Sequence, residues 1–73
     1  MSKLKEAREN AGMSQGKLAD ASGVSVRMIQ KYEQGERDFN KAQVLTAYQL
    51  AQALNTTVEE LIEKDEPNDR TGG

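Results

Sequence analysis

The chain has 73 residues, a formal net charge of −2, and neither cysteine nor histidine. This length allows one domain with a modest core, and the two missing residue types exclude disulfides, zinc fingers and histidine-based acid–base catalysis. The first nine residues are charged and polar, unlike the apolar centre of a secretory signal, and no apolar run approaches the roughly 20 residues that span a bilayer. We therefore expect a cytoplasmic protein that is not an enzyme and uses no cofactor or metal.

Charge is unevenly distributed along the chain. Residues 1–41 carry eight basic and six acidic side chains, whereas residues 42–73 carry two basic and six acidic ones, so the halves have net charges of +2 and −4. An acidic chain argues mildly against nucleic-acid binding, because nucleic-acid binders tend to be basic. The distribution nevertheless leaves a weakly basic face on the N-terminal half.

The pattern of residues that begin and end helices predicts an all-α fold of five helices. Ser14 and Ser25 are good N-caps, Gly23 and Gly35 stand where helices should end, and Thr57 with Glu60 three residues later forms a capping-box pattern. The predicted domain covers residues 1–63, and the charged residues 64–73 are predicted to be a disordered tail. The expected helices span about residues 2–10, 15–21, 26–34 and 41–54, with a short fifth helix after Thr57.

Apolar residues at helical spacing predict which face of each helix is buried. The fourth helix is expected to bury a broad stripe, followed by Asn55 as the residue that ends it. The predicted core residues are Leu4, Ala7 and Ala11 in the first helix, Leu18 and Ala19 in the second, Ile29 and Tyr32 in the third, Val44, Ala47, Tyr48, Ala51 and Leu54 in the fourth, and Val58, Leu61 and Ile62 in the fifth.

Residues 15–34 have the pattern of a helix-turn-helix motif. Ala19 is small where the two helices must cross, Gly23 offers the positive φ that the turn requires, and Val24 is an apolar plug behind it. The third helix then presents a polar and basic face that would enter a major groove. This outward face consists of Ser25, Val26, Arg27, Gln30, Lys31 and Gln34.

The run MSQGKLADASGVSVRMIQKYEQGERD resembles the lambda-repressor-like (Cro/C1, XRE-type) helix-turn-helix family. The resemblance covers about residues 3–63 and stays in register throughout. It implies a five-helix, lambda-repressor-like domain. The matching positions are Ser14-Gln15, Leu18-Ala19, Gly23-Val24-Ser25, Ile29, Glu33, Gly35 and Arg37, followed by Leu50-Ala51, Ala53-Leu54 and the segment from Thr57 to Leu61.

The resemblance also implies a role for each matching site position. Base contacts are implied for Val26, Arg27, Gln30 and Lys31. Phosphate contacts are implied for Gln15, Lys17, Ser25, Arg37 and Lys41. Gln15 is further expected to brace a base-reading side chain, and Arg8 and Glu33 stand where some family members have a partly buried ion pair.

The chain departs from the family pattern at three places. Gly16 weakens the start of the second helix, because glycine costs roughly 1 kcal/mol relative to alanine inside a helix. Ser22 stands where the family often has leucine, which should thin the core. Val26 has no hydrogen-bonding group for a base edge, although it could touch the methyl group of thymine.

The function implied by the resemblance is sequence-specific binding of double-stranded DNA by a transcriptional repressor. One such module reads only a few base pairs, so we expect a homodimer, at least on DNA, formed through the fourth and fifth helices or the loop before them. The alternative is an antitoxin-like or adaptor module that uses the same fold to bind a protein partner. The acidic net charge favours that alternative.

Overall fold

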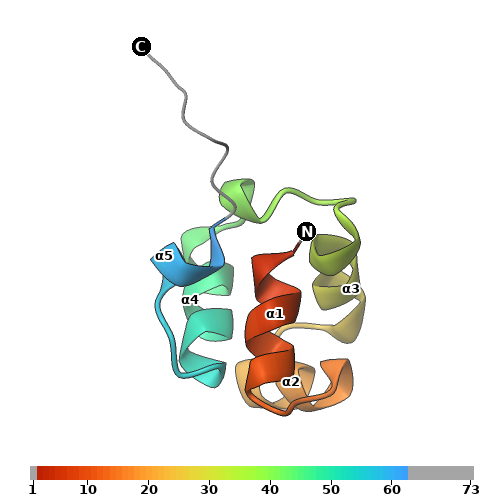
Figure 1. Ribbon diagram of the computed structural model, residues 1–73. Helices are drawn as coiled ribbons and strands as arrows, with labels where there is room; N and C mark the ends of the chain where they lie inside the picture. The colour runs from red at the N-terminus through yellow and green to blue at the C-terminus, as the bar shows by residue number, and fades with distance from the viewer. Residues whose placement is uncertain (1, 63–73) are drawn as a thin grey trace.

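Five α-helices and one 3-10 turn make up residues 2–62, the part of the chain that this computed structural model describes (Figure 1). The all-α prediction is confirmed, whereas the predicted tail lies outside the described residues. The elements are α1 (Lys3–Asn10), α2 (Gln15–Ser22), α3 (Val26–Gln34), the 3-10 turn η1 (Phe39–Lys41), α4 (Val44–Ala53) and α5 (Val58–Leu61).

Hydroxyl side chains begin four of the helices. Ser2, Ser14, Ser25 and Thr57 each accept a hydrogen bond from the backbone N–H three residues later, at distances between 3.0 and 3.4 Å. Such a cap satisfies a donor that the helix cannot pair and stabilises the fold by about 1 kcal/mol. The caps predicted from the sequence are therefore confirmed for α2, α3 and α5.

Each helix contributes one fully buried aliphatic side chain to a common core. These five side chains, all less than 2% exposed, are Leu4, Leu18, Ile29, Leu50 and Leu61. The helices around them pack in a closed circuit, in which α2 contacts α3 and α4, α1 contacts α3 and α5, and α4 contacts α5. Because every helix is short, this shared core, rather than helix propensity alone, holds the domain together.

The start of α4 differs from the prediction. The helix was expected from residue 41, but it begins at Val44, and residues 39–41 form η1 instead. Asp38 begins this turn by accepting the Asn40 N–H at 2.9 Å. Phe39 is drawn into the core, where its ring packs edge-on against Tyr32 with centroids 5.4 Å apart. Burying Phe39 requires a sharp turn, and this turn takes Lys41, the first residue that the prediction gave to the helix, so that α4 begins three residues later than expected.

The buried face of α4 also differs from the prediction. Ala47 and Ala51 are buried as expected, but Val44 is 85% and Tyr48 52% exposed, and the core position is taken by Leu50. Tyr48 lies about 100° around the helix from Ala47, so a face centred on Ala47, Leu50 and Ala51 turns it outward. The predicted stripe was too broad and missed Leu50.

The end of α1 corrects one further expectation. Ala11 was assigned to the core, but it is the C-cap residue of α1 and is exposed. Leu4 anchors that helix, while Ala7 is half-buried beside the core.

Within residues 2–62, no helix is long and apolar enough to cross a membrane, and no group of three acidic, cysteine or histidine side chains could hold a metal ion.

Gly23 and Gly16 make a matched pair for testing the turn before α3. Gly23 has φ +77°, in the left-handed region, whereas a Cβ on Gly16 would meet only the Ser14 Oγ at 3.9 Å. We expect Gly23→Ala to lower the free energy of unfolding by about 1–2 kcal/mol, because a side chain disfavours that backbone conformation. Gly16→Ala should leave stability unchanged or raise it by up to about 1 kcal/mol. Urea denaturation followed by circular dichroism measures both, and equal effects would contradict the assignment of the turn.

Candidate nucleic-acid interface

The turn between α2 and α3 is built as the sequence predicts. Gly23 ends α2 in the left-handed conformation and donates its N–H to the Ala19 carbonyl at 2.9 Å. Val24 is 7% exposed and fills the space behind the turn. Ser22, expected to thin the core, is itself buried, and its Oγ accepts the Val24 N–H at 3.1 Å. A hydroxyl therefore satisfies a buried backbone donor that leucine at this position would leave to another partner.

The helix α3 has one face in the core and one face in solvent. Ile29 and Tyr32 are buried, while Val26 and Arg27 are exposed at the first turn. A second left-handed glycine, Gly35 with φ +81°, ends the helix. Of the remaining outward residues, Ser25 and Gln34 are exposed, and Gln30 and Lys31 are half-buried.

A buried ion pair ties α3 to α1. The Arg8 Nε lies 2.7 Å from the Glu33 Oε2, and the two side chains are only 11% and 4% exposed. The guanidinium makes a second hydrogen bond to the Glu33 Oε1 at 3.1 Å and a third to the Met13 carbonyl at 2.8 Å. The hydrogen bonds to Glu33 raise the pKa of the Arg8 guanidinium above its ordinary value, against the opposing effect of burial. All of these contacts fix the C-terminal half of α3 against the end of α1.

Two glutamines connect the Glu33 carboxylate to the outward face of α3 by hydrogen bonds. The Gln15 Nε2 donates to the Glu33 Oε1 at 3.0 Å, and the Gln30 Nε2 donates to the Gln15 Oε1 at 3.3 Å. Arg8, Glu33, Gln15 and Gln30 thus form one continuous relay from α1 through α3 and α2 back to α3. We call this set the amide relay.

The chemistry of a carboxylate sets the direction of the amide relay. A carboxylate only accepts hydrogen bonds, so the Gln15 amide must turn its NH2 group toward Glu33 and its oxygen toward Gln30. Gln30 then donates one N–H to the Gln15 oxygen. Its own carbonyl oxygen and its second N–H take no part in the amide relay. One acceptor and one donor side by side on an amide match the N6 and N7 edge of adenine.

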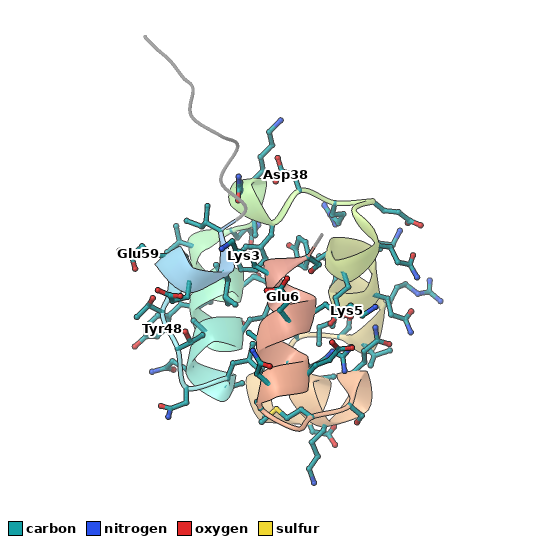
Figure 2. All side chains as sticks on the ribbon, in the orientation of Figure 1. Lys3, Lys5, Glu6, Asp38, Tyr48 and Glu59 are labelled. Carbon is teal, nitrogen blue, oxygen red and sulfur yellow. The ribbon has the colours of Figure 1, made fainter. Side chains whose placement is uncertain are left out.

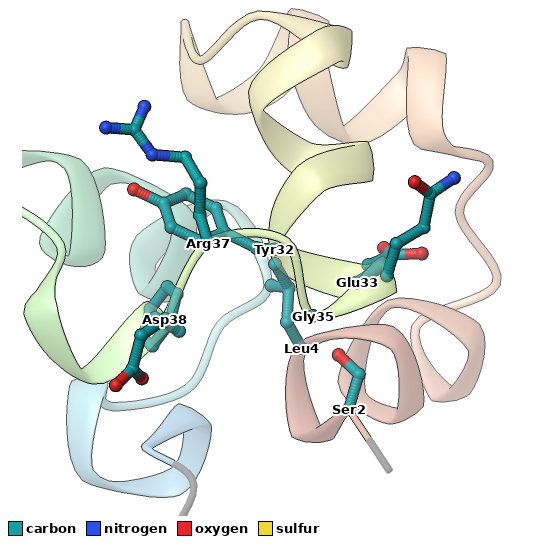
Figure 3. A pocket seen from close by; sticks show the side chains of 9 residues that line it. Ser2, Leu4, Tyr32, Glu33, Gly35, Arg37 and Asp38 are labelled. Carbon is teal, nitrogen blue, oxygen red and sulfur yellow. The ribbon is translucent and has the colours of Figure 1, made fainter.

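The cations at the C-terminal end of α3 lie apart from the relay. Figure 3 shows Arg37 and Glu33 on opposite sides of Tyr32, so the Arg37 guanidinium does not share the carboxylate with Arg8. Its Nη1 lies 3.4 Å from the Met28 Sδ, a weak contact that leaves the charge exposed. Arg37 and Lys41 line one groove between α3 and the start of α4, together with Met28 and Thr46.

The predicted phosphate contacts therefore come from separate elements. Lys17 is exposed in the first turn of α2, and Ser25 is exposed with its hydroxyl already accepting the Met28 N–H at 3.2 Å. Gln15 is half-buried in the amide relay, and Arg37 and Lys41 share their groove. Gln15 and Gln30 are joined by a hydrogen bond, whereas Arg37 and Lys41 only line the same groove, and Lys17 lies in neither group.

Sequence reasoning missed how the relay is connected. It treated the Arg8–Glu33 pair and the bracing Gln15 as two separate features, whereas the Glu33 Oε1 accepts from both side chains. Gln15 and Glu33 are 18 positions apart on different helices. No spacing rule within one helix could have predicted their contact.

A short helix, a glycine turn and a second helix with an exposed polar face define this chain as a helix-turn-helix domain. A family model described as Helix-turn-helix matches residues 4–61. The chain belongs to this family, of the Cro/C1 (XRE) type.

One curated relative extends the comparison. A protein of Methanococcoides burtonii named "Putative HTH-type transcriptional regulatory protein" is 60% identical over 35 residues, which cover 48% of this chain and 11% of that protein. The similarity thus spans a small part of that longer relative. No solved structure gives a significant match.

Removing one partner of the buried ion pair should destabilise the domain strongly. We expect Arg8→Met to cost about 3–5 kcal/mol in the free energy of unfolding, because Glu33 would keep a buried charge without its guanidinium. The double variant Arg8→Met/Glu33→Met removes both charges and should recover at least half of that loss. Urea denaturation of the two variants and the unmodified chain measures this difference. A double variant no more stable than Arg8→Met would contradict the account.

Proposed function

We propose that the chain binds double-stranded DNA sequence-specifically, with α3 in the major groove, and acts as a transcriptional repressor. One observation carries the proposal: α3 lies between two left-handed glycines, its inward face is buried in the core, and the face that carries Arg27 is exposed. Membership of the helix-turn-helix family and the name of the relative support DNA as the ligand.

The proposed reading of bases divides between two parts of α3. Arg27, exposed in the first turn, would bind the O6 and N7 atoms of guanine through two N–H donors of its guanidinium, which is worth about 1–3 kcal/mol of discrimination. Gln30, oriented by the amide relay, offers the acceptor and donor that adenine requires. Val26 adds an apolar contact suited to a thymine methyl group, and Lys31 follows one turn after Arg27.

The proposed affinity comes from the phosphates. Lys17, Arg37 and Lys41 are exposed cations on α2, on the loop after α3 and on η1. Neutralising phosphates with such side chains releases counterions, so binding should weaken steeply with salt. The net charge of −2 means that this attraction must be local to the interface rather than a property of the whole chain.

The proposed assembly on DNA is a homodimer. One recognition helix reaches only a few base pairs, and a twofold dimer reads two half-sites whose centres lie about 34 Å apart, one turn of the duplex. Selection of bound duplexes from a random pool should therefore return an inverted repeat.

Arg27→Ala tests the recognition helix directly. We expect it to weaken binding to the selected duplex by at least tenfold, since about 1.4 kcal/mol corresponds to a factor of ten. Lys5→Ala, which removes an equal charge from an exposed position on α1 (Figure 2), should change affinity less than threefold. Fluorescence anisotropy at two salt concentrations measures both. Intact binding by an Arg27→Ala/Lys31→Ala variant would favour the alternative, a protein-binding module, which the acidic net charge of the chain otherwise supports.

Gln15→Ala tests the amide relay. Without Gln15 the Gln30 amide loses the partner that orients it, so preference at the base read by Gln30 should fall by roughly tenfold while preference at the Arg27 position remains. Gln34→Ala, an exposed glutamine on the same helix, is the control and should leave both preferences unchanged. Repeating the duplex selection with each variant gives the measurement. Equal loss at both base positions would show that Gln15 contributes affinity without orienting Gln30.

A further inference from the structure

Arg37 makes a weak contact inside the groove that it lines with Lys41. Its Nη1 donates to the Met28 Sδ at 3.4 Å, and the arginine side chain is exposed. Figure 3 shows Arg37 and Asp38 pointing in opposite directions, so this neighbouring carboxylate is not directed at the guanidinium. A thioether sulfur is a weak hydrogen-bond acceptor. The contact therefore leaves the guanidinium able to turn toward a stronger acceptor.

The Met28 side chain has one side against the core and one side in the groove. It is half-buried, packs against the core residues, and lines the groove together with Arg37 and Thr46. Met28 lies in the same first turn of α3 as Arg27, so a change at its sulfur occurs at the edge of the proposed DNA-binding surface. Met13, another of the three methionines, is also half-buried against the core and lies before α2.

We propose that Met28 is a site of reversible oxidation that controls the phosphate contact of Arg37. The inference rests on the proposed function, in which Arg37 binds a DNA phosphate. Hydrogen peroxide is the oxidant: a sulfur lone pair forms the new S–O bond, the peroxide O–O bond breaks, and water leaves. The sulfur loses two electrons, and the peroxide is reduced by them. Methionine sulfoxide reductases restore the thioether at the expense of a thiol, so the modification can act as a switch.

A sulfoxide oxygen accepts hydrogen bonds much better than the thioether sulfur. The new oxygen is bonded to the atom that Arg37 already contacts, and a hydrogen bond from a guanidinium is charge-assisted. Oxidation thus converts a weak contact into one that holds the guanidinium over the groove, and a phosphate must compete with it. Because phosphate contacts add affinity without reading bases, oxidation weakens binding to all duplexes alike.

Peroxide treatment of methionine variants tests the site. With oxidation located by peptide mass mapping, the unmodified chain should bind a selected duplex about threefold more weakly or worse, and its salt slope should fall by about 0.9, the value for one phosphate. Met13→Leu should respond in the same way. Met28→Leu, which keeps the apolar volume, should not respond. Unchanged or tighter binding with Met28 oxidised, or a full response in Met28→Leu, would overturn the inference.

Arg37→Ala distinguishes a captured arginine from a damaged core. If the sulfoxide acts through the guanidinium, peroxide should leave the affinity of Arg37→Ala unchanged, and circular dichroism should show the same helix content before and after treatment. An equal loss in Arg37→Ala would contradict the proposal. Met28→Gln carries an acceptor oxygen at a similar reach without peroxide, so it decides the matter if the oxidised chain unfolds. It should weaken binding when Arg37 is present and have no such effect in Arg37→Ala.

Nuclear magnetic resonance tests the contact without DNA. After oxidation of Met28, the guanidinium N–H groups of Arg37 should exchange with water about threefold more slowly or slower still, because their acceptor is stronger. Those of Arg27, an exposed arginine in the same turn as Met28, should keep their rate. If the unmodified chain binds no duplex, the proposed function fails, and this comparison still decides whether the sulfoxide binds Arg37. Equal Arg37 rates before and after oxidation would rule that contact out.

Discussion

Glu33 holds a carboxylate that is almost removed from water, and the arrangement of α1, α3 and the two glutamines depends on how the protein accommodates that charge. An unpaired charge at 4% exposure would be very unfavourable, and the bidentate contact with Arg8 offsets the cost of burying it. Arg8 comes from α1 and also binds the Met13 carbonyl in the loop before α2. One buried ion pair therefore fixes three neighbouring segments of the chain in a single arrangement.

The Glu33 carboxylate also accepts a hydrogen bond beyond those from Arg8, and this bond connects it to the outward face of α3. Because the Glu33 Oε1 accepts from Gln15, the orientation of two amides follows in sequence and ends at Gln30. The hydrogen bond to Gln15 thereby favours one orientation of the half-buried Gln30 amide before any ligand arrives. Such preorganisation lowers the entropy lost on binding. Under the proposed function, stability and base recognition share one group of atoms, so a substitution at Glu33 would affect both.

Local chemistry made most of the fold predictable from the sequence. The caps at Ser14 and Ser25 and the turn at Gly23 depend on residues within four positions of one another, and the structure confirms them. The predicted start of α4 was wrong, because it depends on where Phe39 packs, a contact across the core that sequence spacing does not encode. The predicted buried face of α4 was wrong because Leu50, rather than Tyr48, faces the core. The contact of Gln15 with Glu33 was missed for the same reason. The roles of Arg27, Lys31 and the exposed cations remain predictions.

Different residues of α3 and its flanking turns determine how the helix folds and which side chains it exposes to solvent. Gly23 and Gly35 set where the helix starts and stops, and Ile29 and Tyr32 set how it sits on the body. Arg27 is exposed, and Val26 is 37% exposed, so neither belongs to the buried core. We expect substitutions there to leave the scaffold intact, so that, under the proposed function, a few changes in a single helical turn would exchange one target sequence for another. Each step of such a series of changes would keep the domain folded, because the core residues of the helix stay the same.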